Sequence, residues 1–396
     1  MVSVQEASRI IFSHLYKARI VSVDVHNAVG RVLAEEVRAD RDFPPFDRVA
    51  MDGIAIAYEA WKSGQALFPI QGVQAAGQPQ NQLDKITHCF EVMTGSMLPK
   101  GTDTVIRYED VTVQNGNATI NLEVLHPGTH IHRQKQDAAR SEILLEPGTL
   151  LSPAEIALLA SVGKAEVNVF SFPVTAIVSS GDELVAVEAT PEPHQIRRSN
   201  VYAIEAAMRE MQWTAKRYHL PDEENILEER LKKLADENDV LILSGGVSKG
   251  KFDFIPQVLG KIGIKKVFHH VSQRPGKPFW FGVSDSGKVA FALPGNPVST
   301  YMCFYRYIKP WLMKSLGISS DFESVMLADD FSFTPTLTNF LQVKVKNERG
   351  KLQAYPQPGG GSGDFANLKH VTGFVELEAE KTFFPAGEVV PYIPFR

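Results

Sequence analysis

Cysteine is scarce in this sequence, and the two cysteines, Cys89 and Cys303, lie far apart without a Cys-x-x-Cys spacing. This excludes a disulfide framework and a zinc ribbon. Long apolar runs are also missing, because no stretch approaches the roughly 20 apolar residues that span a bilayer. The N-terminus, Met1 to Glu6, lacks the basic start and apolar run of a secretory signal. We therefore expect a cytoplasmic protein without a membrane segment.

An excess of positive charge is missing as well. The 396 residues carry a net charge of −5, so no broad basic surface is available for nucleic acid or an anionic membrane. Any anion site must therefore be local. Hydrophobic residues make up 44% and charged residues 22%, which is typical of a globular protein. The length predicts about two to four domains.

Helical segments frame a β-rich block in the N-terminal half. Ser3 with Glu6 and Ser152 with Glu155 form capping-box patterns, and the first predicts a helix that runs to about Lys17. The segment between the two helices has short alternating runs, and its Asn-Gly pair at 115–116 predicts a hairpin. We interpret it as a β-rich domain inserted into a helical one.

From residue 170 the pattern alternates strands with helices. Continuous apolar runs at 174–178, 239–243 and 289–293 suit strands that are buried on both faces, and the alternation predicts a mostly parallel sheet. After Gly317 only strand patterns remain. The predicted fold is therefore multi-domain α/β plus β: a discontinuous helical/strand domain (1–41 and 138–169), an inserted β-rich domain (42–137), an α/β sandwich domain (170–320) and a C-terminal β-barrel (321–396).

Three loops that follow the predicted strands carry residues suited to a phosphorylated ligand. Glycines bring backbone amides close to an anion, hydroxyls and lysines contact phosphate, and carboxylates bind a cation such as Mg²⁺. Because carboxyl ends of parallel strands meet at one edge of a sheet, we expect the loops to form one site. Each loop alone also fits a tight turn or a capped helix start. The loops are Ser180-Gly181-Asp182-Glu183, Ser244-Gly245-Gly246-Val247-Ser248-Lys249-Gly250-Lys251-Phe252-Asp253 and Pro294-Gly295-Asn296-Pro297.

Other polar segments are less specific. Arg274 and Lys277 present two cations on a turn stiffened by prolines. The histidines at 126, 130 and 132 lack the partners of a zinc site, so we interpret them as ordinary surface residues. The glycine-rich run 358–364 suits a phosphate loop or a flexible link, and the link is slightly favoured. On their own, the loops around Asp52 and Thr94 are typical of solvated surface.

Six ordered motifs cover essentially the whole chain. They are Phe-Pro-Pro-Phe-Asp…Ala-Met-Asp-Gly (43–53), Met-Thr-Gly (93–95), Ser-Gly-Asp-Glu-Leu (180–184), Ser-Gly-Gly-Val-Ser (244–248), Pro-Gly-Lys-Pro (275–278) and Leu-Pro-Gly-Asn-Pro-Val-Ser (293–299). In this order they resemble the MoeA/gephyrin E-domain family, the molybdopterin molybdenumtransferases. The resemblance implies the four domains above, with an α/β domain similar to MogA, and a homodimer whose active cleft combines the α/β domain of one subunit with the N-terminal domains of the other.

The implied reaction takes adenylylated molybdopterin and molybdate, inserts molybdenum at the dithiolene and releases AMP. The implied partners are the molybdopterin adenylyltransferase upstream and molybdoenzyme-maturation proteins, with no nucleic acid and no membrane. The resemblance assigns catalytic roles to Asp52, Thr94, Glu183, Asp222 and Asp253, of which Glu183, Asp222 and Asp253 bind Mg²⁺. Substrate contacts fall on Ser180, Gly181, Asp182, Ser244, Gly245, Gly246, Ser248, Arg274, Lys277, Pro294, Gly295, Asn296, Pro297 and Ser362, with molybdate on Arg274 and Lys277.

The sequence departs from the family pattern in places. Arg48-Val49 stands where Asn-Ser is common, Ser180 replaces a Thr and Arg274 a Lys, and the segment before Asp137 lacks most of an Arg-rich stretch. Two rival hypotheses remain. An adenylyltransferase acting one step earlier would keep the α/β fold but has no need of three further domains. A receptor-clustering scaffold would be expected to carry a fused second α/β module or a long linker, which this chain lacks.

Overall fold

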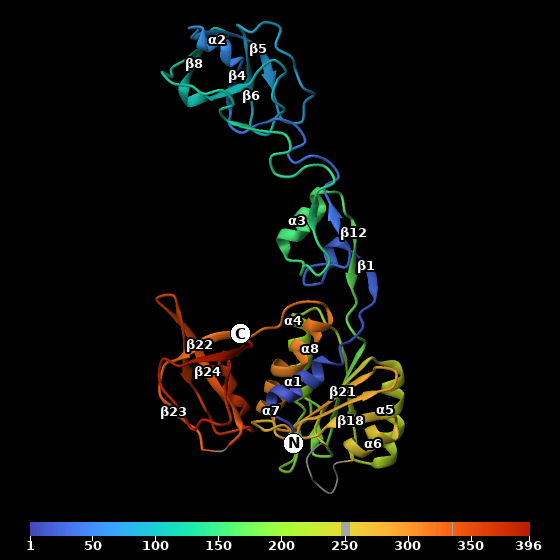
Figure 1. Ribbon diagram of the computed structural model, residues 1–396. Coiled ribbons are helices and arrows are strands. Elements are labelled where there is room, and N and C mark those ends of the chain that lie inside the picture. Colours follow the sequence, from blue (N-terminus) through green and yellow to red (C-terminus); the bar gives the residue numbers. More distant parts are fainter. Residues whose placement is uncertain (247–253, 335) are drawn as a thin grey trace.

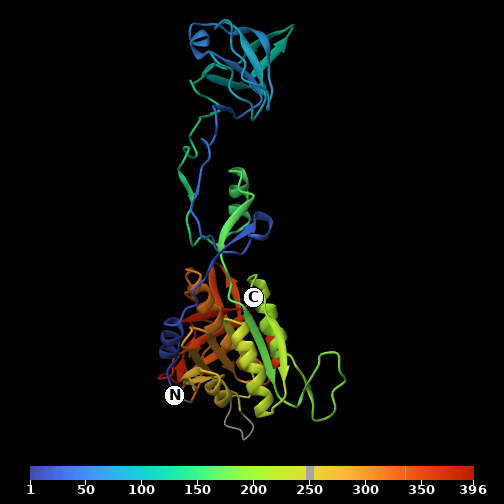
Figure 2. The same ribbon diagram turned by 90° about the vertical axis from the view of Figure 1, so that its right-hand side faces the viewer.

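The computed structural model describes residues 1–246, 254–334 and 336–396. The molecule is elongated (Figure 1). An α/β body and a β-barrel lie side by side at one end, a small unit around α3 (Pro153–Ser161) lies in the middle, and a β-rich module lies at the far end. The view turned by 90° shows the same separation, with two extended segments of chain leading to the module (Figure 2).

The α/β body is built on one sheet in the order β16-β13-β17-β21-β20-β18. Neighbouring strands from β16 to β21 pair in parallel, whereas β20 pairs antiparallel with both β21 and β18. This confirms the mostly parallel sheet. The bounds are β13 (Thr175–Ser180), β16 (Lys216–Leu220), β17 (Val240–Ser244), β18 (Ile264–Phe268), β20 (Trp280–Ser284) and β21 (Val289–Leu293).

Helices cover both faces of this sheet, which explains why its central strands β13, β17 and β21 are buried along their whole length. Ile177 and Ile242 point into one core and Ala176 and Leu241 into the other, because successive side chains of a strand alternate between faces. The first core is covered by α1 (Val4–Phe12), α4 (Asn200–Glu210), α7 (Pro297–Cys303) and α8 (Lys309–Ser315). The second is covered by α5 (Glu224–Glu237) and α6 (Ile255–Lys261).

The first helix is shorter than its sequence pattern predicts. Ser3 accepts a hydrogen bond from the Glu6 amide as a capping residue should, but the Glu6 carboxylate pairs with Arg9 instead of reaching back. The helix ends at Phe12, and the prediction that it runs to about Lys17 is wrong. The Trp311 indole donates to the carbonyl of His14 just beyond the helix end and so holds the non-helical segment against α8.

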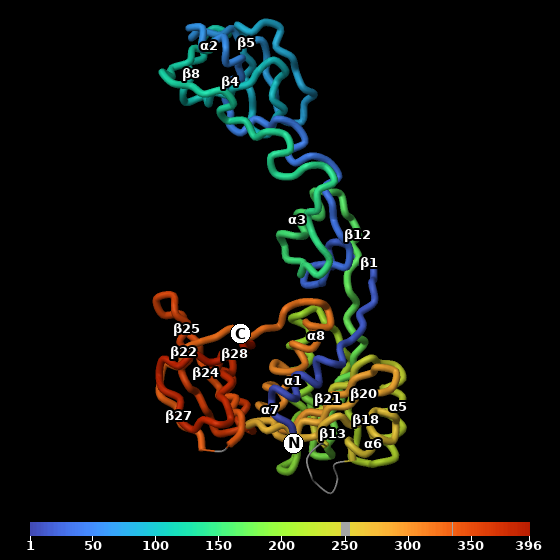
Figure 3. The backbone as a smooth tube through the Cα atoms, viewed as in Figure 1, coloured from blue at the N-terminus to red at the C-terminus, as the bar shows by residue number. Residues whose placement is uncertain are grey.

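Helix α1 packs into the core of the α/β body, whereas the following strand belongs to the small middle unit. There β1 (Ile20–Asp24) pairs antiparallel with β12 (Glu166–Phe170), so the outgoing and returning chain lie side by side (Figure 3). The second capping box is complete, with Ser152 and Glu155 bonded reciprocally at the start of α3. The division of the chain into domains at 1–41 and 138–169 remains a prediction.

The far module is β-rich, and its predicted hairpin is confirmed. Asn115 and Gly116 both take positive φ, as a tight hairpin turn requires, and join β8 to β9. The chain enters and leaves the module at β3 (Arg48–Val49) and β10 (Ile131–His132), which pair with each other, and Val49 is buried in a core of the module. The further elements of the module are β4 (Gly53–Ile56), α2 (Tyr58–Lys62), β5 (Leu67–Gln74), β6 (Cys89–Val92), β7 (Thr104–Arg107), β8 (Val111–Gln114) and β9 (Asn117–Ile120).

The C-terminal strands form a closed barrel, as predicted. In the order β24-β25-β22-β28-β26 each strand pairs with the next, and β26 pairs back with β24. A short strand of the α/β body, β19 (Gln273–Arg274), adds to β24 in parallel. The barrel strands are β22 (Glu323–Leu327), β24 (Thr338–Glu348), β25 (Lys351–Pro356), β26 (Gly373–Leu377) and β28 (Val389–Pro394).

A buried ion pair joins the barrel to the body. A π-helical turn, Phe304–Ile308, separates α7 from α8 and carries Arg306. Its Nε donates to the Glu376 carboxylate on β26 over 2.7 Å, and its Nη1 donates to Ser8 Oγ of α1 over 3.0 Å. The side chains of Arg306 and Glu376 are 9% and 12% exposed, so this pair is largely shielded from water. One guanidinium therefore links the barrel, the long helical segment and the first helix.

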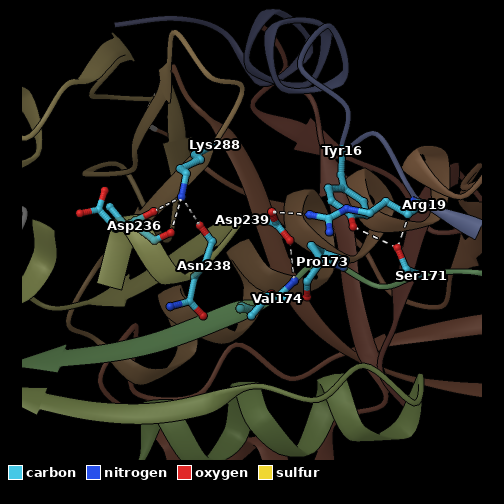
Figure 4. Close-up of polar contacts among 11 residues, drawn as sticks. Tyr16, Arg19, Ser171, Pro173, Val174, Asp236, Asn238, Asp239 and Lys288 are labelled. Carbon is cyan, nitrogen blue, oxygen red and sulfur yellow. Dashed lines mark hydrogen bonds and ion pairs between the residues drawn. The ribbon is translucent and has the colours of Figure 1, made fainter. Parts of the chain in front are cut away.

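The amino-terminal edge of the sheet is also held by polar contacts (Figure 4). Asp239 accepts from the Val174 amide over 2.9 Å, and Lys288 Nζ donates to the Asn238 carbonyl over 3.2 Å. These contacts tie the starts of three parallel strands together. Among the described residues, no helix is long and apolar enough to cross a membrane.

Replacement of Glu376 by alanine is expected to destabilise the protein by about 3–5 kcal/mol, because it leaves the buried Arg306 charge without its partner. Glu59→Ala is the matched control. Glu59 pairs with Lys62 on the surface of α2, where both side chains are more than half exposed, so its loss should cost less than about 1 kcal/mol. Urea unfolding followed by tryptophan fluorescence measures both, and equal effects would contradict a special role for the buried pair.

Candidate functional site

The three predicted loops meet at the carboxyl edge of the sheet. They follow β13, β17 and β21, which are parallel neighbours, and they line one pocket with a volume of about 260 Å³. The pocket is lined by Ser179, Ser180, Glu183, Leu184, Ile196, Arg197, Arg198, Ser199, Asn200, Val201, Ser244, Gly245, Gly295, Asn296 and Pro297. We call it the strand-end pocket.

Glycine is required where these loops touch. At Gly245 the backbone has φ +99°, and a Cβ there would lie 2.6 Å from the carbonyl oxygen of Ser180 on the neighbouring loop. The Cα of Gly245 in turn lies 3.8 Å from the position a Cβ would take at Gly295. The backbones of the three loops therefore lie close together. The polar lining of the pocket includes the side chains of Glu183, Arg197, Arg198, Asn200 and Asn296 besides the serine hydroxyls.

Two of the proposed metal-binding carboxylates lie beside this pocket. Glu183 lines it, and Asp222, which follows the fourth parallel strand β16, accepts a short hydrogen bond from the Ser180 hydroxyl. Asp182 accepts from the Asp222 amide over 3.2 Å. No group of three metal-binding side chains occurs among the residues the structure describes. Asp253 lies outside those residues, as do Ser248, Lys249 and Lys251.

His219, which the sequence did not single out, stands behind the loop of Ser180. Its Nδ1 lies 3.1 Å from the hydroxyl of Ser179. Burial lowers the pKa of His219 below its ordinary value of 6.5, and the positive charge of Arg198 lowers it further. The imidazole is therefore neutral at physiological pH and serves as a hydrogen-bonding support for the strand end.

The cationic turn of Arg274 and Lys277 lies next to the barrel. Arg274 lines a second pocket of about 480 Å³, which we call the barrel pocket, and its guanidinium lies 5.8 Å from the Phe333 ring. The opposite wall is the glycine-rich run 358–362, ending in Ser362. Lys277 is exposed beside Arg274 and does not line this pocket in the structure.

The glycine-rich run forms part of the wall of the barrel pocket and is held by hydrogen bonds. The interpretation as a flexible link, which the sequence slightly favoured, is therefore corrected. The Ser362 carbonyl accepts from the Val298 amide of α7 over 3.1 Å, and the Ser362 hydroxyl accepts from Asn296 Nδ2 over 2.8 Å. Gly360 N donates to the Asp364 carboxylate over 2.8 Å. Because Asn296 also lines the strand-end pocket, these bonds connect the two pockets.

A fully buried amide supports the Arg274 turn from below. Gln273 Nε2 donates to the Gly276 carbonyl over 2.9 Å, which closes the turn, and Gln273 Oε1 accepts from the Tyr307 hydroxyl over 2.5 Å. Both Gln273 and Tyr307 are completely shielded from solvent. Buried polar groups with all partners in place fix a single local geometry, so the turn is rigid.

Asp52 and Thr94 lie in the far module, on loops flanking its β4 and β6, and are remote from the strand-end pocket of the same chain (Figures 1 and 2). The Asp52 carboxylate accepts from the Thr94 amide over 2.6 Å and from the Thr94 hydroxyl over 2.7 Å. The amide contact, followed by the hydroxyl contact, lowers the pKa of Asp52. The pair is exposed and preorganised, but no single chain brings it to the loops of the α/β body.

Asp137 and His132 take part in a hydrogen-bonded contact where the chain enters and leaves the module. His132 bridges the Asp137 carboxylate and Arg48, at 2.8 Å to each. Asp47 accepts from the Gln134 amide and from the Arg133 guanidinium. No metal-binding group involving the histidines at 126, 130 and 132 is found in the described part of the chain.

Comparison with known proteins identifies the family. Residues 2–163 match the MoeA N-terminal region (domain I and II), residues 176–314 a probable molybdopterin binding domain, and residues 324–395 the MoeA C-terminal region (domain IV). A molybdopterin molybdenumtransferase of Synechocystis sp. is 38% identical over 99% of both chains. The chain belongs to the molybdopterin molybdenumtransferase family.

Other members of the MoeA family agree with this. The molybdopterin molybdenumtransferase of Bacillus subtilis is 30% identical, over 100% of this chain and 94% of its own length. The crystal structure of a molybdopterin biosynthesis MoeA protein from Pyrococcus horikoshii OT3 matches 100% of both chains with a TM-score of 0.84 and 26% identity. The predicted family, the fold class and the general activity of a transferase are confirmed.

Replacement of Gly245 by alanine is expected to destabilise this MoeA-family protein by about 1–3 kcal/mol, because alanine disfavours the positive φ and its Cβ would collide with the Ser180 carbonyl. Gly260 provides the control. It lies within α6 with open space around it, so Gly260→Ala should stabilise by up to about 1 kcal/mol. Thermal unfolding compares the two, and a neutral Gly245→Ala variant would contradict the close contact of the loops.

The lowered pKa of His219 predicts a pH dependence of stability. Below pH 6.5 the unfolded chain binds a proton that the folded His219 resists, so stability falls as pH is lowered through this value and is retained above it. Urea midpoints at about pH 7.5 and about pH 5.5 should therefore differ less in His219→Gln than in the parent protein. An unchanged difference would show that His219 is as easily protonated in the folded state as in the unfolded one.

Proposed function

We propose that this chain inserts molybdenum into adenylylated molybdopterin, using molybdate and releasing AMP. The observation that carries the proposal is the connection of two pockets of different character. The strand-end pocket offers glycine loops and hydroxyls to a nucleotide-tagged ligand, and the barrel pocket beside it offers Arg274 to an oxyanion. Asn296 and Ser362 join them. A ligand that carries a phosphoanhydride and must meet a dianion needs two such adjoining sites.

The proposed contacts follow from the chemistry of each loop. Amides of Gly245 and Gly246, with the hydroxyls of Ser244 and Ser248, bind phosphate oxygens, and the rigid 294–297 loop ahead of α7 supplies the facing wall. Arg274 and Lys277 bind molybdate, which Ser362 contacts from the barrel side. Ser180, Gly181 and Asp182 complete the surface around Asp222.

Mg²⁺ would be bound by Glu183 and Asp222, with Asp253 as the third carboxylate. The fit rests on the two described carboxylates beside the strand-end pocket, since Mg²⁺ is commonly held by one or two carboxylates together with phosphate oxygens and water. When bound, the ion would neutralise the charge that develops on the phosphoryl group. Ser180 donates a hydrogen bond to Asp222 and so holds that carboxylate at the edge of the pocket.

We further propose that the active unit is a homodimer with shared clefts. The preorganised, exposed Asp52–Thr94 pair lies at the opposite end of an elongated chain from the loops, so a second copy must supply it. The cleft would then combine the strand-end pocket of one subunit with Asp52 and Thr94 of the other. The same proposal includes a cytoplasmic location. It also includes two kinds of partner, the adenylyltransferase that acts upstream and the molybdoenzyme-maturation proteins.

The purified protein is expected to release AMP from adenylylated molybdopterin only when molybdate and Mg²⁺ are both present. Asp52→Ala and Glu183→Ala proteins should each be inactive, but an equilibrated mixture should recover about a quarter of the parent activity, because half of the dimers then contain one intact cleft. AMP release measured by chromatography gives both results.

Two outcomes would count against these proposals. Consumption of ATP with unmodified molybdopterin, without molybdate-dependent AMP release, would favour the adenylyltransferase reading. A mixture of the two variants that stays inactive, or a monomer in sedimentation at micromolar concentration, would contradict the shared cleft. The control mixture is Glu183→Ala with Asp222→Ala, whose changes fall in the same α/β body and cannot complement each other.

A further inference from the structure

Asn200, the first residue of α4, holds two of the site loops together. Its side-chain Nδ2 donates to the Gly295 carbonyl over 2.8 Å and to the Ser244 hydroxyl over 2.9 Å, and lies 3.4 Å from Thr300 Oγ1. Gly295 belongs to the loop after β21 and Ser244 ends β17. One amide group from a third element therefore fixes the spacing of two loops that approach the ligand from adjacent strands.

This is not the usual task of an asparagine at a helix start. At the N-cap, one position before Asn200, asparagine and serine normally accept hydrogen bonds from free backbone amides. In α4 the N-cap Ser199 makes no side-chain capping bond, and Asn200 directs its amide toward the sheet edge. The helix therefore begins without a side-chain cap, and the Asn200 side chain donates to the two loops.

The other atom of the amide shows that packing alone does not explain the residue. Asn200 Oδ1 is buried and has no hydrogen-bond partner within the described residues. A buried acceptor without a partner costs free energy, so an asparagine placed here only for stability is disfavoured. The two hydrogen bonds that Nδ2 donates to the loops offset this cost.

The same loop continues the connection to the barrel pocket. Asn296, directly after Gly295, donates to Ser362 over 2.8 Å. Thr300, one turn into α7, donates to the Pro294 carbonyl and so fixes the start of the loop. A shift of the loop at Gly295 would change the strand-end pocket, which Gly295 lines.

We propose that Asn200 is a positioning residue, which sets the spacing between the glycine loop and the 294–297 loop for the adenylylated ligand. The inference rests on the proposed function, since it concerns the same site. It differs from a purely structural role because Asn200 and the loops it joins line the pocket, and Asn200 is not a member of the hydrophobic core of the α/β body.

The test uses the full-length protein with two changes at this position. Asn200→Ala removes the donor, and Asn200→Asp keeps the shape but cannot donate to the Gly295 carbonyl when ionised. Each is expected to raise the KM for adenylylated molybdopterin by about ten-fold or more, as loss of hydrogen bonds to the loops predicts. The KM for molybdate should stay within about two-fold, because the Arg274 turn is held separately by Gln273.

Asn238→Ala is the matched control. Asn238 is an asparagine that is buried more deeply than Asn200, and its Nδ2 donates to one backbone group, the Leu234 carbonyl, over 2.8 Å. It lies at the opposite edge of the sheet, where Figure 4 shows it beside Lys288. Its loss should lower the melting temperature without changing either KM. Calorimetric scans of all variants show whether each one is folded at the assay temperature.

The outcomes separate this inference from the function on which it rests. A parent protein that releases no AMP overturns the proposed function, and the inference with it. A parent protein that is active, together with Asn200→Ala and Asn200→Asp proteins of unchanged KM, overturns the inference alone. A KM increase shared by Asn238→Ala also overturns it, because the effect would then follow from general destabilisation. A rise confined to the Asn200 variants, Asn200→Asp included, supports it.

Discussion

The ion pair of Arg306 with Glu376 lies between the barrel and the α/β body, where barrel residues such as Phe340 and Phe374 also pack into the core of the body. Together these contacts hold the barrel in the position that forms the barrel pocket. The pair is nearly shielded from water, so its geometry is restrained more strongly than that of a surface pair. With the barrel held in this place, Ser362 reaches Asn296, and β19 adds to β24. The Arg274 turn is then fixed between the barrel on one side and the buried Gln273–Tyr307 contact on the other.

The parts of the site that depend on local pattern could be predicted from the sequence. Strands such as β17, which is apolar up to its last residue, were expected to be buried on both faces, and the parallel sheet then brought Ser180, Ser244 and Gly295 to one edge. Ser362 could not be placed in this way. A run of glycines has the composition of a link, and its order comes from Val298 and Asn296, which are far away in the sequence. Asn200 was hidden because its residue type already suits a helix start.

The contacts between elements that are far apart in the sequence could not be predicted from local sequence patterns either. The capping residue Ser3 predicts that a helix begins, but nothing local shows that α1 packs on the α/β body while β1, a few residues later, pairs with β12. The separation of Asp52 from the strand-end loops also appears only in three dimensions. The six motifs identify one family, but in the structure they lie at two ends of the molecule. This separation is the physical reason for the proposal that two subunits together form the active cleft.

The π-helical turn sets how the side chains before it are rotated about the helix axis relative to those of α8. At its end the Lys309 amide bonds to the Phe304 carbonyl, five residues back, and the next residue, Pro310, has no amide hydrogen to donate. Each residue of an α-helix turns the chain by about 100°. Removal of one residue from this wide turn would therefore rotate Arg306 relative to α8 by roughly that angle. The number of residues in this turn therefore determines whether Arg306 faces Glu376 of the barrel.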